Sequence, residues 1–535
     1  MTNNIIDELK WRNLVKDISN SDKILNAQKL QKGIYCGFDP TNDSLHLGNL
    51  MQIILLRRFA LFGFQAIALV GGATGMIGDP SGKSQERNLL DTEQLANNLK
   101  SISKQLTSLV NHKATSDFNA LELIREFNLL NNNDYEMLDM VFKSINPNAQ
   151  YQNSLIAVLK KLPLPLQEVG LSNQELNEFY QILKLDPNYL KQQENLANLN
   201  FSDLLGYIKV WTQAWVQFSE LTWGHSATNA IKNIKVLNNN DWLGQINIIN
   251  FLRDVGKDFN INQMLGKEMV AKRLETGISY TEFSYMVLQS YDFYHLYTKE
   301  ECFLQSGGSD QWGNITTGLE LIRKKVGESS QAAGLTINLL TKANGEKFGK
   351  SEQGAIFLAA EKTSTYDFYQ FLFNQEDSDL KKLLAALTFF EEDQIAFILN
   401  LHQKNPKLRI GQKILAAVVT IFIHKLPGYF QALKITNALF KDEIKQLTAQ
   451  EILAIFKDVP IIKQVSDQNL ATLLVDNKIC QSKRQVKDLL NDGAISVNGE
   501  KMTDENVVIS KKAAINQQIT LIKKGKRHYY LVFHE

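Results

Sequence analysis

A short apolar run, followed by a turn and the start of a helix, is the feature that most constrains the fold of this chain. Residues 34–38 form the run, Asp39-Pro40 ends it, and a helical pattern begins near His46. This order favours an α/β domain in which a buried strand leads into the amino-terminal end of a helix. Free backbone N–H groups and the helix dipole make such an end a good place for a phosphate.

Two polar side chains at this helix start could bind that phosphate. His46 and Asn49 lie three residues apart, so they project from the same face of the first turn, and each can donate a hydrogen bond. Gly48 lets a nucleotide lie close to the backbone. The alternative is that His46 and Asn49 only cap a helix of an ordinary α/β domain, and this motif alone does not decide between the two.

A second motif lies about three hundred residues further along the chain. It reads Lys347-Phe-Gly-Lys350-Ser351, and glycines at 345, 349 and 354 bracket the two lysines. A flexible loop with two ammonium groups can stabilise the negative charge that develops on pyrophosphate during nucleotidyl transfer. A solvated basic turn is the alternative, but the pairing with the first motif favours nucleotide binding.

A third pattern presents three polar groups on one face of an expected helix. Tyr285, Gln289 and Asp292 lie at positions i, i+4 and i+7 among apolar neighbours. Polar groups in such surroundings are half-buried and need partners, although a solvated face is the alternative. A glycine-rich turn with Gly308 and Asp310 follows, and its carboxylate suits a ribose.

Changes of pattern along the 535 residues indicate four parts, in keeping with roughly three or four domains for this length. Residues 1–112 and 231–356 alternate strand and helix signals and are expected to form one α/β domain. Residues 113–230 interrupt it as a helical insertion of unknown role. Helical periodicity dominates residues 357–467, and residues 468–535 form a compact α/β tail.

A net charge of +1 hides an asymmetry between two of these parts. From residue 478 to the end, eleven Lys and Arg stand against six Asp and Glu, which gives +5. Residues 113–230 have eight against thirteen, which gives −5. The tail is therefore suited to a polyanion, and the insertion is not.

Composition predicts the cellular compartment and argues against membrane, secreted and metal-binding proteins. No apolar stretch approaches the roughly 20 residues of a membrane span, and the acidic, helical start is unlike a signal peptide. Three cysteines, Cys36, Cys302 and Cys480, are widely spaced and lack metal-ligand spacing. We therefore expect a cytoplasmic protein with no membrane contact, no DNA partner and no protein-bound metal.

The two motifs, in this order, resemble the HIGH box and the KMSKS loop of class I aminoacyl-tRNA synthetases. The residues around Tyr35, Tyr285 and Asp292 make the chain most similar to bacterial-type tyrosyl-tRNA synthetases, over essentially all of it except 113–230. The resemblance implies a Rossmann-like catalytic domain, a helical domain on the anticodon side of the tRNA, and a homodimeric enzyme. It also implies formation of tyrosyl-adenylate from L-tyrosine and ATP with Mg²⁺, then transfer to the terminal adenosine of tRNA(Tyr).

Individual roles also follow from the resemblance. Tyr35 and Asp292 would bind the phenolic hydroxyl of the substrate. The rest of the tyrosine site would be Asp79, Asn239, Tyr285, Gln289 and Gln305. The catalytic residues would be His46, Asn49, Lys347 and Lys350. The ATP site would comprise Gly37, Asp39, Thr41, His46, Gly48, Asn49, Gly308, Asp310, Gln311, Lys347, Lys350 and Ser351.

The tail resembles a small RNA-binding fold named after a ribosomal small-subunit protein. It contains a basic helix near residue 483, an Asn498-Gly499 hairpin turn and a basic hairpin with aromatic residues. A solvated basic surface is the alternative to RNA binding. The candidate tRNA contacts are Lys483, Arg484, Lys487, Lys526 and Arg527.

Two positions depart from the family pattern. The HIGH box ends in Asn49 rather than His, and an amide N–H can replace an imidazole N–H. Asn338 stands where the family usually has Pro before the loop, and we expect a softer hinge there.

Two other functions are alternatives. A tryptophanyl-tRNA synthetase is disfavoured by Tyr35, Asp292 and the basic tail, and an inactive synthetase with only RNA binding is disfavoured by the retained lysines and His46.

Overall fold

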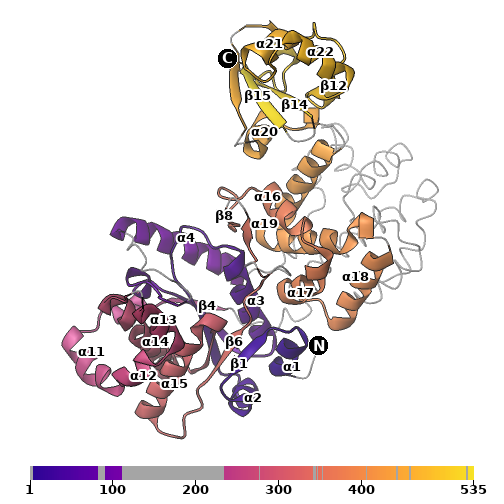
Figure 1. The fold of residues 1–535 in the computed structure, drawn as a ribbon. Coiled ribbons are helices and arrows are strands. Elements are labelled where there is room, and N and C mark those ends of the chain that lie inside the picture. The colour runs from indigo at the N-terminus through magenta and orange to yellow at the C-terminus, as the bar shows by residue number, and fades with distance from the viewer. Residues whose placement is uncertain are drawn as a thin grey trace, which may run out of the picture. The chain divides into compact units, whose positions relative to one another are not determined.

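A computed structural model of the chain forms two compact units (Figure 1). The first comprises Met1–Lys362 and Phe371–Ile423, and the second comprises Thr363–Gln370 and His424–Glu535. The expected insertion, 113–230, lies outside the described residues, so its role stays open. The described residues are 4–81, 91–110, 234–275, 277–341, 345, 348–351, 354–404, 406–440, 444–456, 459–464, 466–525 and 528–534.

A six-stranded sheet in the order β1-β6-β5-β2-β3-β4 organises the first unit. Only β1 and β6 pair antiparallel. The chain runs from β2 to β3 and β4 on one side of β2, and to β5 and β6 on the other, so the strand order reverses between β2 and β5. Ligands of such sheets bind outside the carboxyl ends of the strands at this point. The strands are β1 (Val15–Ile18), β2 (Gly33–Phe38), β3 (Gln65–Val70), β4 (Lys235–Asn238), β5 (Cys302–Gly308) and β6 (Ala333–Ile337).

Apolar side chains hold the main helices against this sheet. Helix α3 (Leu47–Leu61) packs on β2 and β3, and α14 (Tyr280–Lys299) packs on β5 and α15 (Trp312–Val326). Tyr35 and Phe293 are buried in the core between sheet and helix. The sequence prediction of a Rossmann-like α/β domain is confirmed, as are its strand at 34–38 and its helix after His46.

Further helices, of which α19 is the longest among the described residues, and a small hairpin complete the structure outside the tail. None of the helices within the described residues is long and apolar enough to cross a membrane. The helices are α1 (Ile5–Trp11), α2 (Ser21–Lys29), α4 (Thr92–Val110), α10 (Asn240–Leu243), α11 (Ile248–Asp254), α12 (Ile261–Leu265), α13 (Glu268–Leu274), α16 (Thr365–Phe373), α17 (Asp377–Leu387), α18 (Glu392–Lys404), α19 (Ile410–Phe440) and α20 (Ala449–Ile455), and the hairpin is β7 (Lys350–Ser351) with β8 (Gly354–Ala355).

The carboxyl-terminal part is a small α+β fold built on a five-stranded sheet in the order β12-β11-β14-β15-β9. Asn498 and Gly499 have positive φ and turn β11 into β12, as the sequence predicts. Strand β9 pairs with β15, so this sheet begins upstream of residue 468. Its elements are β9 (Ile461–Gln464), β10 (Gln468–Asn469), α21 (Leu470–Asp476), α22 (Lys483–Asn491), β11 (Ile495–Val497), β12 (Glu500–Lys501), β13 (Val508–Ile509), β14 (Ile519–Lys524) and β15 (His528–His534).

Candidate active site

A cavity of about 310 Å³ opens where the strand order reverses, at the carboxyl ends of β2 and β5. Most of the site residues proposed from the sequence line it: Tyr35, Gly37, Asp39, Thr41, His46, Asn49, Asp79, Asn239, Tyr285, Gln289, Asp292, Gln305, Gly308, Asp310 and Gln311. The other lining residues had no individual role assigned from the sequence: Cys36, Phe38, Gln52, Leu69, Gly71, Thr74, Ser306 and Gly307. Residues far apart in the sequence therefore share one cavity.

Tyr35 and Asp292 lie at the buried end of the cavity. The Tyr35 hydroxyl is buried and has no hydrogen-bond partner within the described residues. Asp292 accepts hydrogen bonds from Asn239 Nδ2 at 2.9 Å and Trp242 Nε1 at 2.7 Å. Burial raises the pKa of the Asp292 carboxyl to about 7, against the opposing effect of these two bonds. Burial and the nearby Asp292 also raise the pKa of the Tyr35 phenol, so it stays a protonated donor.

A continuous chain of hydrogen bonds joins Asp292 to a second carboxylate, Asp39. Asn239 Nδ2 also donates to Thr74 Oγ1 at 3.0 Å, and the Thr74 hydroxyl donates to Asp39 at 2.9 Å. The Tyr285 hydroxyl donates to the other oxygen of Asp39 at 2.8 Å. The resemblance assigned Asp39 to the nucleotide, and in this structure its carboxylate holds residues of the tyrosine site.

A cluster of amides surrounds Asp79 on another wall. Gln311 Nε2 donates to Asp79 at 2.7 Å, and Gln289 Nε2 donates to Gln311 at 3.2 Å. Asn314 Nδ2 in turn donates to Gln289 at 3.0 Å. Gln305 is buried on β5, and its Oε1 lacks a partner within the described residues. The cluster offers one carboxylate and several amide groups to a polar substrate group.

In the first turn of α3, His46 and Asn49 cap the helix and also line the cavity. His46 is the N-cap residue: its Nδ1 accepts from the Gly48 N–H at 3.0 Å, while Asn49 Oδ1 accepts from the His46 N–H at 3.0 Å. The capping alternative is therefore real. It does not exclude ligand binding, because an imidazole that accepts at Nδ1 carries its proton at Nε2, and both side chains line the cavity. A Cβ at Gly48 would lie 2.8 Å from the His46 ring.

The second motif lies directly against this helix start. Leu47 N–H donates to the Ile356 carbonyl at 3.0 Å, and Ile356 N–H donates to the Gly349 carbonyl at 2.9 Å. Gly349 has φ of +89°, and a Cβ there would meet the Leu47 Cβ at 3.0 Å. The close approach and the positive φ both favour glycine at this position.

The side chains of both lysines in this loop lie outside the part of the chain that the structure describes. Lys347 lies outside the described residues, and of Lys350 and Ser351 only the backbone is described, as strand β7. Their assignment to ATP therefore remains a prediction. Among the described residues, no group of His, Cys, Asp and Glu could hold a metal ion.

Asn338, which stands in place of proline before the loop, makes three hydrogen bonds to the turn between α1 and β1. Its N–H donates to the Leu14 carbonyl at 2.8 Å, and its Nδ2 donates to the carbonyls of Asn13 at 3.1 Å and Val15 at 3.2 Å. Proline has no N–H and could not make the first of these bonds. These contacts restrain the position that we expected to be softer.

Three of the candidate tRNA contacts lie together on α22. Lys483, Arg484 and Lys487 are exposed, whereas Val486 and Leu490 on the opposite face are buried. Lys526 and Arg527 lie outside the described residues. The described part of the tail thus presents one basic helical face to solvent.

Two residues of the site escaped the sequence analysis. Trp242 donates to Asp292 and stacks on His295 with ring centroids 4.4 Å apart. Thr74 bridges Asp39 and Asn239. Neither lies in a recognisable local pattern, because each partner comes from a distant segment of the chain.

Comparison with known proteins gives a consistent result over the whole chain. The family described as class I tRNA synthetases (W and Y) matches residues 28–148 and 186–441. The tyrosine--tRNA ligase SYY-like C-terminal domain matches residues 451–532. The tyrosine--tRNA ligase of Mycoplasma capricolum subsp. capricolum is 37% identical over 532 residues, and that of Listeria monocytogenes serovar 1/2a is 38% identical over 531 residues. Each alignment covers 99% of both chains.

Solved structures share the fold. A C-terminally truncated mitochondrial tyrosyl-tRNA synthetase of Aspergillus nidulans superposes with a TM-score of 0.53 at 22% identity, over 82% of this chain and 94% of that one. A truncated mitochondrial tyrosyl-tRNA synthetase of Coccidioides posadasii gives 0.52 at 23% identity, over 81% and 92%.

Proposed function

This chain belongs to the tyrosine--tRNA ligase family of class I tRNA synthetases, and we propose how its residues carry out that activity. It joins tyrosine to tRNA with the use of ATP. In the first step the tyrosine carboxylate attacks the α-phosphate of ATP, which gives tyrosyl-adenylate and releases pyrophosphate. In the second step the terminal adenosine of tRNA(Tyr) accepts the tyrosyl group and AMP leaves.

Recognition of the phenol rests on one observation, the unpartnered hydroxyl of Tyr35 beside the carboxyl of Asp292. A substrate hydroxyl between them would donate to Asp292 and accept from Tyr35. Asn239 and Trp242 hold the carboxylate in place for this contact. Phenylalanine has no hydroxyl and would leave these buried groups unpaired, which is costly.

The α-ammonium group of tyrosine would bind at the wall formed by Asp79, Gln289 and Tyr285. Asp79 supplies a negative charge, and the Gln289 and Gln311 amides orient it through the hydrogen bonds of the cluster. Tyr285 donates to Asp39, so its oxygen remains an acceptor for the ammonium group. This arrangement would place the substrate carboxylate toward the start of α3.

ATP would bind between α3 and the loop that carries Lys350. His46 and Asn49 would donate hydrogen bonds to the phosphates, and Lys347 and Lys350 would neutralise the leaving pyrophosphate. No residue needs to form a covalent bond, because in-line positioning and charge stabilisation supply the rate. We propose that Mg²⁺ enters with the ATP phosphates, as it usually does in sites of this kind.

The tail would contribute to tRNA binding through the exposed face of α22. Its three cations, Lys483, Arg484 and Lys487, suit the phosphates of RNA.

Because tRNA and ATP are cytoplasmic substrates, and Cys36, Cys302 and Cys480 are all free thiols, we propose a cytoplasmic location.

A second copy of the chain is the proposed partner of an apolar surface on the catalytic unit. Large apolar side chains of this surface are exposed on α11, α12 and the start of α14: Ile248, Ile249, Leu252, Ile261 and Tyr280. Such groups of exposed apolar residues favour an interface. Sedimentation analysis should give a dimer, and Ile248→Asp combined with Ile249→Asp should give a monomer.

Tyrosine-dependent exchange of pyrophosphate into ATP is the direct test of the proposed mechanism. The purified chain should catalyse this exchange with tyrosine but not with phenylalanine or tryptophan, and it should aminoacylate tRNA(Tyr). Exchange with tryptophan would favour tryptophanyl activity instead. Binding of tRNA without any exchange would indicate an RNA-binding protein whose synthetase domain is inactive.

A further inference from the structure

The loop that carries Lys350 is fixed to the body of the catalytic unit at both of its ends. Downstream, Ile356 accepts a hydrogen bond from the Leu47 N–H at the start of α3, and Leu358 N–H donates to the Leu45 carbonyl at 2.8 Å. Upstream, Phe348 N–H donates to the Leu340 carbonyl at 2.9 Å. The downstream attachment is part of the ATP site itself, whereas the upstream attachment depends on another helix.

That helix is α17, and it reaches the base of the loop through the side chain of Lys382. Lys382 Nζ donates to the Thr341 carbonyl at 2.7 Å and to the Thr341 hydroxyl at 3.1 Å. Hydrogen bonds from an ammonium group are stronger than those between neutral groups. Phe371, near the end of α16, packs on Phe348 with ring centroids 5.3 Å apart. The base of the loop thus rests on α17 and on Phe371, which belong to the same compact unit as the loop.

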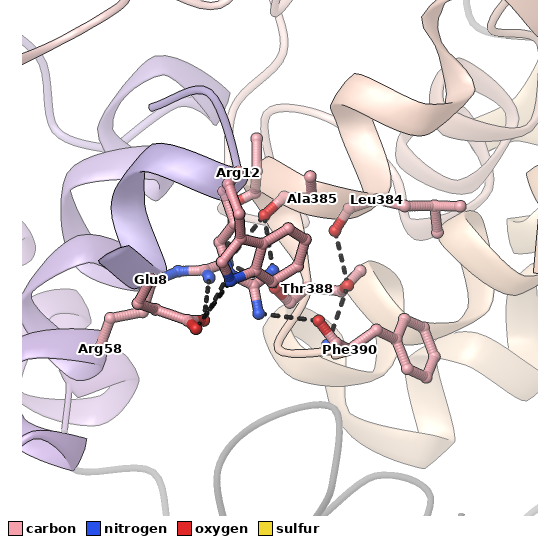
Figure 2. Close-up of polar contacts among 9 residues, drawn as sticks. Glu8, Arg12, Arg58, Leu384, Ala385, Thr388 and Phe390 are labelled. Atoms are coloured by element: carbon pink, nitrogen blue, oxygen red, sulfur yellow. Dashed lines mark hydrogen bonds and ion pairs between the residues drawn. The ribbon is translucent and has the colours of Figure 1, made fainter. Parts of the chain in front are cut away.

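The carboxyl end of α17 is held by two buried arginines, Arg12 and Arg58 (Figure 2). The Ala385 carbonyl accepts from Arg12 Nη1 at 2.9 Å and from Arg58 Nη2 at 3.0 Å. Arg58 also donates to the Thr388 carbonyl, and Arg12 Nη2 donates to the Phe390 carbonyl at 2.7 Å. The last carbonyls of a helix lack partners within it and attract cations, so these guanidinium groups fix the carboxyl end of α17.

A buried carboxylate completes this arrangement. Glu8 forms an ion pair with Arg12 at 2.6 Å and approaches Arg58 Nη1 at 3.6 Å. Arg58 is 1% exposed, and this burial lowers the pKa of its guanidinium group although the nearby Glu8 opposes the shift. Arg58 belongs to α3, the helix whose first turn carries His46. The position of α17 is therefore tied to that of α3.

We propose that Lys382 is a positioning residue for the ATP step, through which α17 sets the base of the Lys350 loop relative to α3. Lys382 and Ala385 are three residues apart, or about 4.5 Å along the helix axis, so the two attachments share less than one helical turn. A segment this short transmits position rigidly. This inference rests on the proposed roles of His46 and Lys350.

Substitution of Lys382 by methionine removes the ammonium group and keeps the aliphatic stem. Lys382→Met should lower the kcat of tyrosine-dependent pyrophosphate exchange about tenfold and leave the KM for tyrosine within about twofold, because misplacement of a catalytic group affects the transition state most. Lys382→Arg keeps a donor and should recover part of the rate. Lys381→Met is the matched control, since Lys381 is the exposed neighbour on the same helix, and its rate should not change.

A double substitution distinguishes positioning from general stability. If Lys382 acts through the loop, Lys382→Met should change the exchange rate by less than about twofold in a Lys350→Ala background. An equal loss in both backgrounds would overturn the inference, as would a loss of tyrosine affinity or of Tm with kcat unchanged. A failure of the proposed function would appear already as absent exchange in the unsubstituted chain, whereas a failure of this inference would appear only among the variants.

Discussion

Asn239 binds Asp292 through a 2.9 Å hydrogen bond that joins positions 53 residues apart in the sequence. The same amide nitrogen donates to Thr74, which donates to Asp39. Asn239 and Thr74 therefore link two of the carboxylates that line the cavity, Asp292 and Asp39. Because Asn239 uses both of its N–H groups in this way, the orientation of Asp292 is fixed before any substrate binds.

Replacing Asp292 by asparagine should weaken the preference for tyrosine over phenylalanine. Asparagine keeps the size but loses the charge, and its own amide hydrogens would face the donors of Asn239 and Trp242. We expect kcat/KM for tyrosine to fall about 10- to 100-fold, the equivalent of one hydrogen bond to a charged group, with little change for phenylalanine. Pyrophosphate exchange with each amino acid measures this. Asp241 is an exposed acid on α10, and Asp241→Asn should change neither value. An undiminished preference for tyrosine in Asp292→Asn would contradict the assignment.

Trp242→Phe should change the pH dependence of the reaction. The substitution keeps a ring to stack on His295 but removes the hydrogen bond that lowers the pKa of Asp292. That pKa, about 7 in the native chain, should rise, so less carboxylate is present at neutral pH. The acid limb of the kcat/KM profile for tyrosine should move to higher pH. Trp11→Phe removes an equivalent bond to Glu8 and should leave the profile unmoved; an unmoved limb in Trp242→Phe would exclude this role.

Asp292 should also make stability depend on pH. Its pKa is raised from 3.8 to about 7 in the folded chain, so the folded state binds this proton more tightly than the unfolded state does. The protonated Asp292 carboxyl therefore stabilises the folded chain below pH 3.8, and this stabilisation is lost as the pH rises from 3.8 to about 7. Within this pH range, the free energy of unfolding of Asp292→Asn should rise relative to that of the native chain by about 1.4 kcal/mol for each pH unit. Thermal unfolding without substrates at about pH 5 and about pH 8 measures the difference, and a constant difference would argue against a raised pKa.

The sequence predicts the local parts of this site better than the contacts between segments that are far apart in the sequence. Strand β2, the start of α3 and the face of α14 with Tyr285, Gln289 and Asp292 follow from patterns that a few neighbouring residues display. Strand order, the reversal beside β2 and the pairing of β9 with β15 depend on distant segments. No local periodicity encodes them.

Trp242, Thr74 and Lys382 show the same limit for single residues. Each matters through one hydrogen bond to a distant partner, and each looks ordinary in its own segment. Asn239 and Asp79 were proposed only from the family resemblance, because neither has a pattern around it. His46 and Asn49 cap α3 and also line the cavity, so the capping interpretation of this motif does not exclude the phosphate-binding one.

Neutralising the basic face of α22 should impair tRNA charging alone. Replacing Lys483, Arg484 and Lys487 together by alanine should raise the KM for tRNA(Tyr) and leave tyrosine-dependent pyrophosphate exchange unchanged. Each lost phosphate contact should reduce the slope of log binding constant against log salt by about 0.7–0.9. Filter binding across a salt series measures this slope. Lys511→Ala with Lys512→Ala, two exposed lysines elsewhere in the tail, should reduce the slope less; an equal reduction would assign the effect to net charge rather than to α22.

His46 offers a way to separate helix capping from phosphate binding. Asparagine is a good N-cap residue, so His46→Asn should keep the capping bond and the native Tm, but it removes the imidazole Nε2–H proposed to bind phosphate. Loss of one such transition-state donor should lower the kcat of pyrophosphate exchange about 100-fold. His46→Ala should show the same loss of rate together with a loss of about 1 kcal/mol in stability, because the cap is lost as well. Single-turnover adenylate formation and thermal unfolding of both variants measure the two effects independently. Native activity in His46→Asn would mean that capping is the whole role of His46.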